Sequence, residues 1–163
     1  MTIEIRTATQ IDAGILLGLI KDLAVYEKQP VSVVQATEED LRRDGFGVQP
    51  RFESRLAFIE GRPAGFTLFF PDYSTWEGRP GLFLEDIFVA EWARRRGIGR
   101  ALMADLADIA LARGWRRINF RVLTWNPARE FYEALGSAHI DEWLPYRIEG
   151  AALSRLARGK AQR

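Results

Sequence analysis

Two adjacent carboxylates interrupt an otherwise apolar stretch of this sequence. Glu85 and Asp86 lie inside Leu82–Val89, whose composition predicts a strand. Burying a carboxylate without a partner is costly, and an apolar setting raises its pKa toward a value that suits a proton acceptor. Successive strand residues point to opposite faces, so we expect the two side chains to separate. The pair is a candidate for proton transfer, and the alternative is a pair of surface acids at a strand end.

A turn rich in arginine and glycine follows this strand. Residues 94–100 read Arg-Arg-Arg-Gly-Ile-Gly-Arg and lead into a helix predicted over Arg100–Arg113. The first amides of a helix lack internal partners and carry the positive end of its dipole, and glycines let a diphosphate approach the backbone. The turn therefore predicts an anion site, with a solvated basic loop as the alternative.

Several other chemistries are excluded. The glycines are not followed by the Lys-Ser/Thr of a nucleotide-triphosphate loop, and Leu102 stands where a dinucleotide-binding turn needs Gly or Ala. The chain has no cysteine, which removes disulfides, thiolate metal sites and a cysteine nucleophile. His139 is the only histidine and is expected at the surface, and no His/Asp/Glu cluster has metal-ligand spacing, so we predict no metal.

Composition limits the partners and the location. The chain has 163 residues, with 23 Lys+Arg against 22 Asp+Glu, so its charge does not favour a nucleic acid. Arg94–Arg96 lacks the interleaved aromatics that single strands prefer. No apolar run approaches the roughly 20 residues of a membrane span, and the first residues read as a strand and not as a signal peptide. With no cysteine, a cytoplasmic location is expected.

The order of elements predicts one α+β domain over residues 1–163 with a mixed sheet. A capping-box spacing at Thr9 and Asp12 precedes the first helix, and about 155–163 is expected to be a frayed basic tail. Gly61-Arg62-Pro63 is expected as a hairpin turn and Asp72–Gly81 as a loop. The predicted strands are Ile3–Arg6, Arg55–Glu60, Ala64–Phe70, Leu82–Val89, Ile118–Leu123 and Tyr146–Glu149. The predicted helices are Ile11 to about Glu27, Thr37 to about Gly45, Arg100–Arg113 and Pro127 to about Gly136.

The arginine and glycine turn resembles a known cofactor motif. Arg94-x-x-Gly97-x-Gly99 after an apolar strand is similar to the acetyl-CoA pyrophosphate motif of the GNAT superfamily of N-acetyltransferases. Further segments resemble its diamine (spermidine/spermine) and thialysine branch, and the likeness covers about residues 3–153. Those segments are Arg6–Thr9, Leu23–Glu27, Asp44–Gly47, Tyr73–Arg79, Leu84–Asp86, Trp125-Asn126 and Phe131–Gly136. The resemblance implies a three-layer α/β/α fold whose mostly antiparallel sheet is splayed between the strands ending at Val89 and starting at Ile118, to hold acetyl-CoA.

The resemblance also implies roles. Glu85 would accept the amine proton, through water, and Tyr132 would protonate the departing thiolate, although packing alone would make Tyr132 an ordinary core side chain. Six steps separate Asn126 from Tyr132 where related sequences usually have seven, as a one-residue deletion would explain. Backbone N–H groups of Ile87, Phe88 or Val89 would stabilise the oxyanion, through a bulge that opens the strand toward the thioester. The implied acetyl-CoA contacts are Ile87, Phe88, Val89, Arg94, Arg95, Arg96, Gly97, Ile98, Gly99, Arg100 and Asn126.

The acceptor pocket is implied in the same way. Acids and aromatics suit a cationic amine, and the pocket residues would be Tyr26, Glu27, Trp76, Glu85, Asp86, Glu142 and Trp143. Relatives that prefer polyamines often have Asp where this chain has Ser74. The predicted reaction is acetyl transfer from acetyl-CoA to a small-molecule primary amine such as a diamine, a polyamine or thialysine. A peptide or aminoglycoside acceptor and a non-catalytic acyl-CoA-binding module are the alternatives. Branch members are homodimers, and the apolar cluster Trp143–Tyr146 favours a homodimer here.

Overall fold

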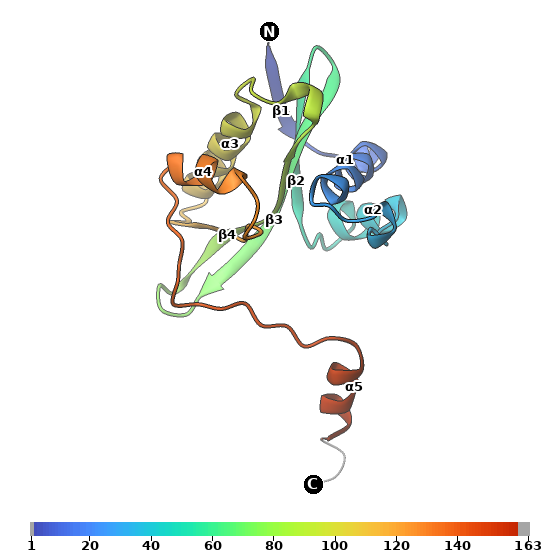
Figure 1. The fold of residues 1–163 in the computed structure, drawn as a ribbon, viewed down its shortest axis with the longest axis vertical. Helices are drawn as coiled ribbons and strands as arrows, with labels where there is room; N and C mark the ends of the chain where they lie inside the picture. The colour runs from blue at the N-terminus through green and yellow to red at the C-terminus, as the bar shows by residue number, and fades with distance from the viewer. Residues whose placement is uncertain (1, 160–163) are drawn as a thin grey trace. The chain divides into compact units, whose positions relative to one another are not determined.

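The computed structural model describes residues 2–159, and the chain divides into two compact units, with the division falling between Ala128 and Arg129. The first unit contains a five-stranded sheet in the order β1-β2-β3-β4-β5 (Figure 1). Neighbouring strands are antiparallel except β4 and β5, which are parallel. The sheet is therefore mixed and mostly antiparallel, as predicted. The strands are β1 Ile3–Thr7, β2 Glu53–Ile59, β3 Arg62–Ser74, β4 Arg79–Val89 and β5 Ile118–Phe120.

Helices cover both faces of this sheet. The helices α1 (Ala13–Tyr26) and α2 (Glu38–Phe46) lie on one face, and α3 (Ile98–Ala112) lies on the other (Figure 1). Apolar stripes explain the packing, because Leu16 of α1 and Leu102 of α3 are both fully buried against the sheet. This confirms the three-layer fold. Short 3₁₀ turns occur at Gln10–Asp12, Val31–Val33 and Glu91–Ala93.

The capping box predicted before α1 is present. The backbone N–H of Thr9 donates to the Asp12 carboxylate at 2.8 Å. Arg6 of β1 donates two hydrogen bonds to the same carboxylate, at 2.8 and 2.7 Å. The Arg6 guanidinium, more than any other group, holds the pKa of Asp12 well below its usual range. This ion pair fixes the start of α1 to the first strand.

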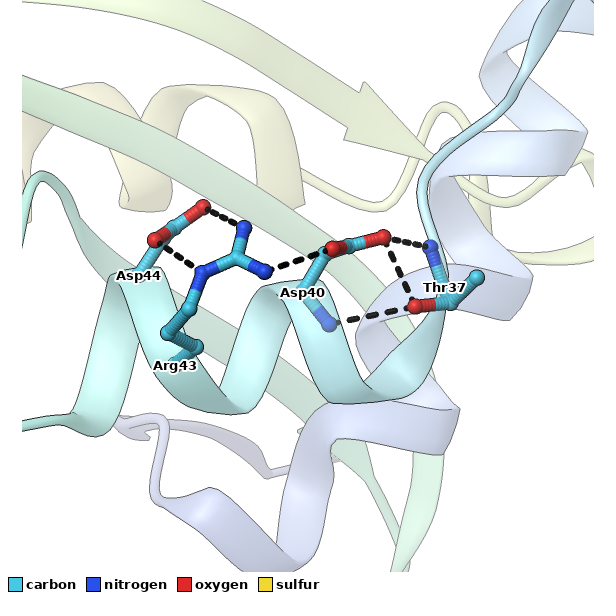
Figure 2. Close-up of polar contacts among 4 residues, drawn as sticks. All are labelled: Thr37, Asp40, Arg43 and Asp44. Atoms are coloured by element: carbon cyan, nitrogen blue, oxygen red, sulfur yellow. Dashed lines mark hydrogen bonds and ion pairs between the residues drawn. The ribbon is translucent and has the colours of Figure 1, made fainter.

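A second capping box begins α2, as Figure 2 shows. The Thr37 hydroxyl accepts from the backbone N–H of Asp40 at 3.1 Å, while the Asp40 carboxylate accepts from the Thr37 N–H at 3.0 Å and from its hydroxyl at 2.7 Å. Arg43 then bridges Asp40 and Asp44, at 2.9 and 2.6 Å (Figure 2). The helix ends at Phe46, one residue after the predicted Gly45.

Three expectations about the strands of the sheet were wrong. Asp72–Gly81 is not one loop, because β3 continues to Ser74 and β4 begins at Arg79. Arg62 and Pro63 belong to β3 and not to the turn before it. The strand from Ile118 ends at Phe120 and not at Leu123.

The helices also differ from expectation in places. Helix α3 begins at Ile98, two residues earlier than predicted. The second unit contains the helix α5 (Gly150–Arg158) where the sequence predicted the start of a frayed tail, and 146–149 form no strand. The end of that predicted tail, 160–163, lies outside the described residues. The helix α4 (Ala128–Ala134) follows Pro127, as expected. Within residues 2–159, no helix has both the length and the apolar character that crossing a membrane requires.

Candidate active site

The edge of β4 that faces β5 is open over its second half. The two strands pair only from Leu82 to Leu84 on β4, opposite Ile118 to Phe120 on β5. Strand β4 then continues to Val89 while β5 has ended. This opening is the predicted splay of the sheet.

A β-bulge lies at the start of the open stretch. Leu84 pairs with Phe69 of β3 and Asp86 pairs with Leu68, so Glu85 is the extra residue on β4. A bulge interrupts the regular alternation of a strand. The expectation that Glu85 and Asp86 leave opposite faces assumed a regular strand, and it does not apply here.

The bulge also decides which amides face the opening. The N–H of Leu82 donates toward β5, to Arg117, whereas the N–H of Ala90 donates toward β3, to Ala64. In an antiparallel pair, alternate residues direct their backbone groups toward the same neighbour. Counting back from Ala90, Phe88 faces β3, while Ile87 and Val89 face the open edge. Of the three predicted oxyanion donors, Ile87 and Val89 direct their backbone N–H groups toward the open edge, where they can donate to a ligand.

Asp86 lies on the face of β4 that α1 covers. It shares that face with Phe88, two residues on, whose ring lies 6.2 Å from the ring of Tyr26. Burial, and then the negative charges of Glu85 and Glu27, raise the pKa of Asp86 to about 6. Burial also raises the pKa of Glu27. The charges of Glu85 and Glu27 thus both act on Asp86, and a cationic group beside Asp86 would relieve this repulsion.

Glu85 has different surroundings. Its side chain is exposed, and it accepts from Arg121 at 3.3 Å. The Arg121 guanidinium also lies 5.3 Å from the centre of the Phe83 ring. Glu85 is therefore accessible to water, whereas Asp86 is largely withdrawn from it.

The arginine and glycine turn leaves the start of α3 open to solvent. Gly97 is the N-cap residue of α3 with φ +82°, a left-handed conformation that glycine adopts without strain. Arg95, Arg96 and Gly97 are exposed, whereas Ile98 is buried and anchors the helix. The turn therefore combines accessible helix amides with arginines, which is the arrangement that a diphosphate requires.

Other predicted residues lie apart from this group or in the second unit. Trp76 lies in the β3–β4 turn and is 89% exposed. In the second unit, Glu142 and Trp143 are exposed, and the Tyr132 ring packs at 5.2 Å from the ring of Phe131. His139 is exposed, as expected, and lies 2.8 Å from Asp141.

The sequence did not reveal the contacts of Asn126. This residue is only 9% exposed, and its side-chain oxygen accepts from the Tyr26 hydroxyl at 3.0 Å and from the N–H of Ala128 at 2.9 Å. No local pattern could have indicated the contact with Tyr26, because the two residues are 100 positions apart in the chain.

Comparison with known proteins agrees with this geometry. The sequence model of the acetyltransferase (GNAT) family matches residues 21–137, which include the end of α1, the bulge and the glycine turn. The chain belongs to the GNAT family. It is therefore an acetyl-CoA-dependent N-acetyltransferase.

Relatives with assigned names are similar over nearly their whole length. A thialysine N-ε-acetyltransferase of Bos taurus is 38% identical, covering 95% of this chain and 97% of its own. The protein of the same name in Caenorhabditis elegans is 36% identical, covering 94% and 96%. Among solved structures, an integron cassette protein from the mobile metagenome of V. cholerae has a TM-score of 0.81 at 28% identity, covering 97% of this chain and 99% of its own. The resemblance to the thialysine branch of the GNAT family is confirmed.

Proposed function

We propose that this GNAT enzyme transfers the acetyl group of acetyl-CoA directly to the primary amine of a small molecule of the thialysine or diamine type. The observation that carries the proposal is the group of carboxylates Glu27, Glu85 and Asp86 beside the open edge of β4. An ammonium group placed among them would offset their mutual repulsion. Two relatives are named as thialysine N-ε-acetyltransferases, which supports the same class of acceptor.

The acetyl-CoA would run along the open edge of β4. The amides of Ile87 and Val89 are the candidate donors to the thioester oxygen, with Phe88 packing beneath. The diphosphate would lie at the start of α3. Its proposed contacts are Arg94, Arg95, Arg96, Gly97, Ile98, Gly99 and Arg100, with Asn126 on the other side of the opening.

The proposed acceptor pocket begins at the end of α1. Glu27 and Asp86 would bind the ammonium group, and Glu85 would take its proton through water, which its exposure allows. Tyr132 would protonate the departing thiolate. Tyr26, Trp76, Glu142 and Trp143 are proposed as further pocket residues, in which aromatic faces suit a cation.

A panel of acceptors tests the reaction. The purified protein is given acetyl-CoA and each amine in turn, and free thiol is measured. Thialysine, lysine, ornithine, short diamines and spermidine cover the proposed class, while a peptide amine and an aminoglycoside cover other acceptors. We expect thiol release with one or more of the small amines. Release only with the peptide or the aminoglycoside would refute the proposed acceptor class, and CoA binding without release would indicate a non-catalytic module.

Two substitutions test the proposed proton transfers. Glu85→Gln should lower the rate most near neutral pH and recover part of it at higher pH, where more of the amine is already neutral. Tyr132→Phe should lower turnover while acetyl-CoA binding changes little. General acid or base assistance contributes about 10²–10⁴-fold, so a loss below about tenfold in either variant would show that the role was assigned wrongly.

We also propose that the protein is a homodimer and works in the cytoplasm. Exposed apolar side chains between Trp143 and Tyr146 support the dimer. A sequence without cysteine supports a reducing compartment, and fractionation of cells that express the protein tests the location.

A further inference from the structure

The end of α1 is tied to the segment that follows β5. Tyr26 is the last residue of α1, and its hydroxyl donates a hydrogen bond of 3.0 Å to the side-chain oxygen of Asn126. Beside it, the Lys28 ammonium lies 4.1 Å from the centre of the Trp125 ring. Tyr26 packs on β4 through Phe88, and Asn126 follows β5. The hydrogen bond therefore links the two sides of the splay.

The Asn126 end of this link is anchored. Its Oδ1 also accepts from the N–H of Ala128 at 2.9 Å, and its own N–H donates to the carbonyl of Leu123 at 2.9 Å. A backbone N–H can only donate, so the side-chain atom that faces Ala128 is the oxygen, and the amide nitrogen points elsewhere. Tyr26 therefore donates to an acceptor whose position and orientation are already fixed.

The other end of the link reaches the arginine and glycine turn. The Arg94 guanidinium lies 4.6 Å from the centre of the Tyr26 ring and 5.6 Å from that of Phe88. The Nε of Arg94 donates to the carbonyl of Val89 at 3.0 Å. Tyr26, Phe88 and Arg94 also line a groove of about 720 Å³ along α1. The ring of Tyr26 thus supports the first residue of the turn, while its hydroxyl holds the opposite side of the opening.

We propose that Tyr26 is a positioning residue that sets the width of the splay for acetyl-CoA through its hydrogen bond to Asn126. It acts through Asn126 and Arg94 and exchanges no proton with either substrate. Without the hydroxyl, the segment between β5 and α4 is held to α1 by fewer contacts. Binding of acetyl-CoA must then order that segment, which weakens the binding. The inference rests on the proposed acetyl transfer, but it concerns the cosubstrate and not the identity of the amine.

Tyr26→Phe tests the proposal, because it removes the hydroxyl and keeps the ring under Arg94. A hydrogen bond contributes about 0.5–1.5 kcal/mol, so we expect the Kd for CoA by calorimetry and the KM for acetyl-CoA to rise about two- to tenfold. Because phenylalanine keeps the aromatic face that the acceptor pocket would use, the rise in KM should be larger for acetyl-CoA than for the amine. Amide hydrogen exchange at Asn126 and Ala128 should become faster, since both amides depend on the anchored side chain or its turn. Tyr73→Phe removes a hydroxyl from an exposed tyrosine of β3 and is the matched control.

A double-mutant cycle assigns the effect to the link. Asn126→Ala removes the acceptor, and the double variant with Tyr26→Phe should bind CoA no more weakly than Asn126→Ala alone, because the two residues share one contact. Three results would each overturn the proposal. They are additive losses of CoA binding in the double variant, unchanged amide hydrogen exchange at Asn126 and Ala128, and a rise confined to the KM for the amine. If Tyr26→Phe weakens CoA binding and loosens the segment while the wild-type protein acetylates no small amine, the link stands and the proposed acceptor class is refuted.

Discussion

At the scale of single residues, the environment of Asp86 departs from what stability alone would select. The native protein holds its pKa at about 6, above the value of about 4 expected in an unfolded chain. Between these values the native state binds more protons than the unfolded state, so the free energy of unfolding decreases as pH rises from about 4 to about 6. The residue therefore destabilises the fold at neutral pH, which is expected where a carboxylate is retained to bind a cation.

This difference in the pKa of Asp86 predicts that removing its charge stabilises the fold but weakens the binding of the amine. Asp86→Asn should raise the free energy of unfolding at pH 7 by roughly 1–3 kcal/mol, because the neutral amide is buried at lower cost. The same change should raise the KM for the amine at least about tenfold, since the ammonium group loses a charged partner. In the wild-type protein, kcat/KM for the amine should increase with pH through about 6 as Asp86 ionises. Urea unfolding and steady-state kinetics measure both effects.

The exposed Asp108 of α3 supplies the control. Asp108→Asn should leave both the free energy of unfolding and the KM for the amine nearly unchanged. If Asp86→Asn lowered the stability at pH 7, the carboxylate would have a stabilising partner in the native protein, and its assignment as an ammonium ligand would be wrong.

At the scale of elements, we expect the capping box of α2 to stabilise the fold without taking part in catalysis. Thr37→Ala removes the hydroxyl that accepts from the N–H of Asp40, and loss of an N-cap costs about 1 kcal/mol. Thr37→Ser keeps the hydroxyl and should stay close to the wild type. Thr37, and to a smaller extent Arg43, lower the pKa of Asp40 in the native protein. The ionised Asp40 carboxylate therefore stabilises the fold at pH values above the pKa of an unfolded aspartate. This stabilisation is lost as the pH falls through the lower pKa of the native state. Urea unfolding at pH 7 and pH 3 should show a smaller difference between Thr37→Ala and the wild type at the lower pH. A loss of kcat in Thr37→Ala would contradict the view that α2 is remote from the chemistry.

Elements with strong local signals were predicted well from the sequence. The capping box at Thr9, the helix that starts after Thr37, the helix α3 and the glycine turn are set by nearby residues, and the structure contains each of them. A bulge in this strand was expected, but its position at Glu85 was not predicted. Its position depends on how β3 and β4 pair, which is a matter of register and not of local composition. The bond between Tyr26 and Asn126 was missed for the same reason, because it joins distant segments.

At the scale of the whole molecule, the second unit carries apolar side chains that its own residues leave exposed. Trp143, Leu144, Tyr146 and Ile148 are all exposed in a stretch without helix or strand. Contiguous apolar surface of this kind marks interaction sites in soluble proteins, and a second copy of the chain is the partner that we propose.

We predict the mass of a dimer by light scattering at micromolar concentration. Leu144→Glu should shift the mass toward that of a monomer, because it places a charge within the apolar stretch. Leu111→Glu on α3 is the matched control, since Leu111 and Leu144 are both 72% exposed, and it should remain dimeric. A monomeric wild-type protein would refute the dimer, and dissociation by both variants would place the interface beyond the segment proposed.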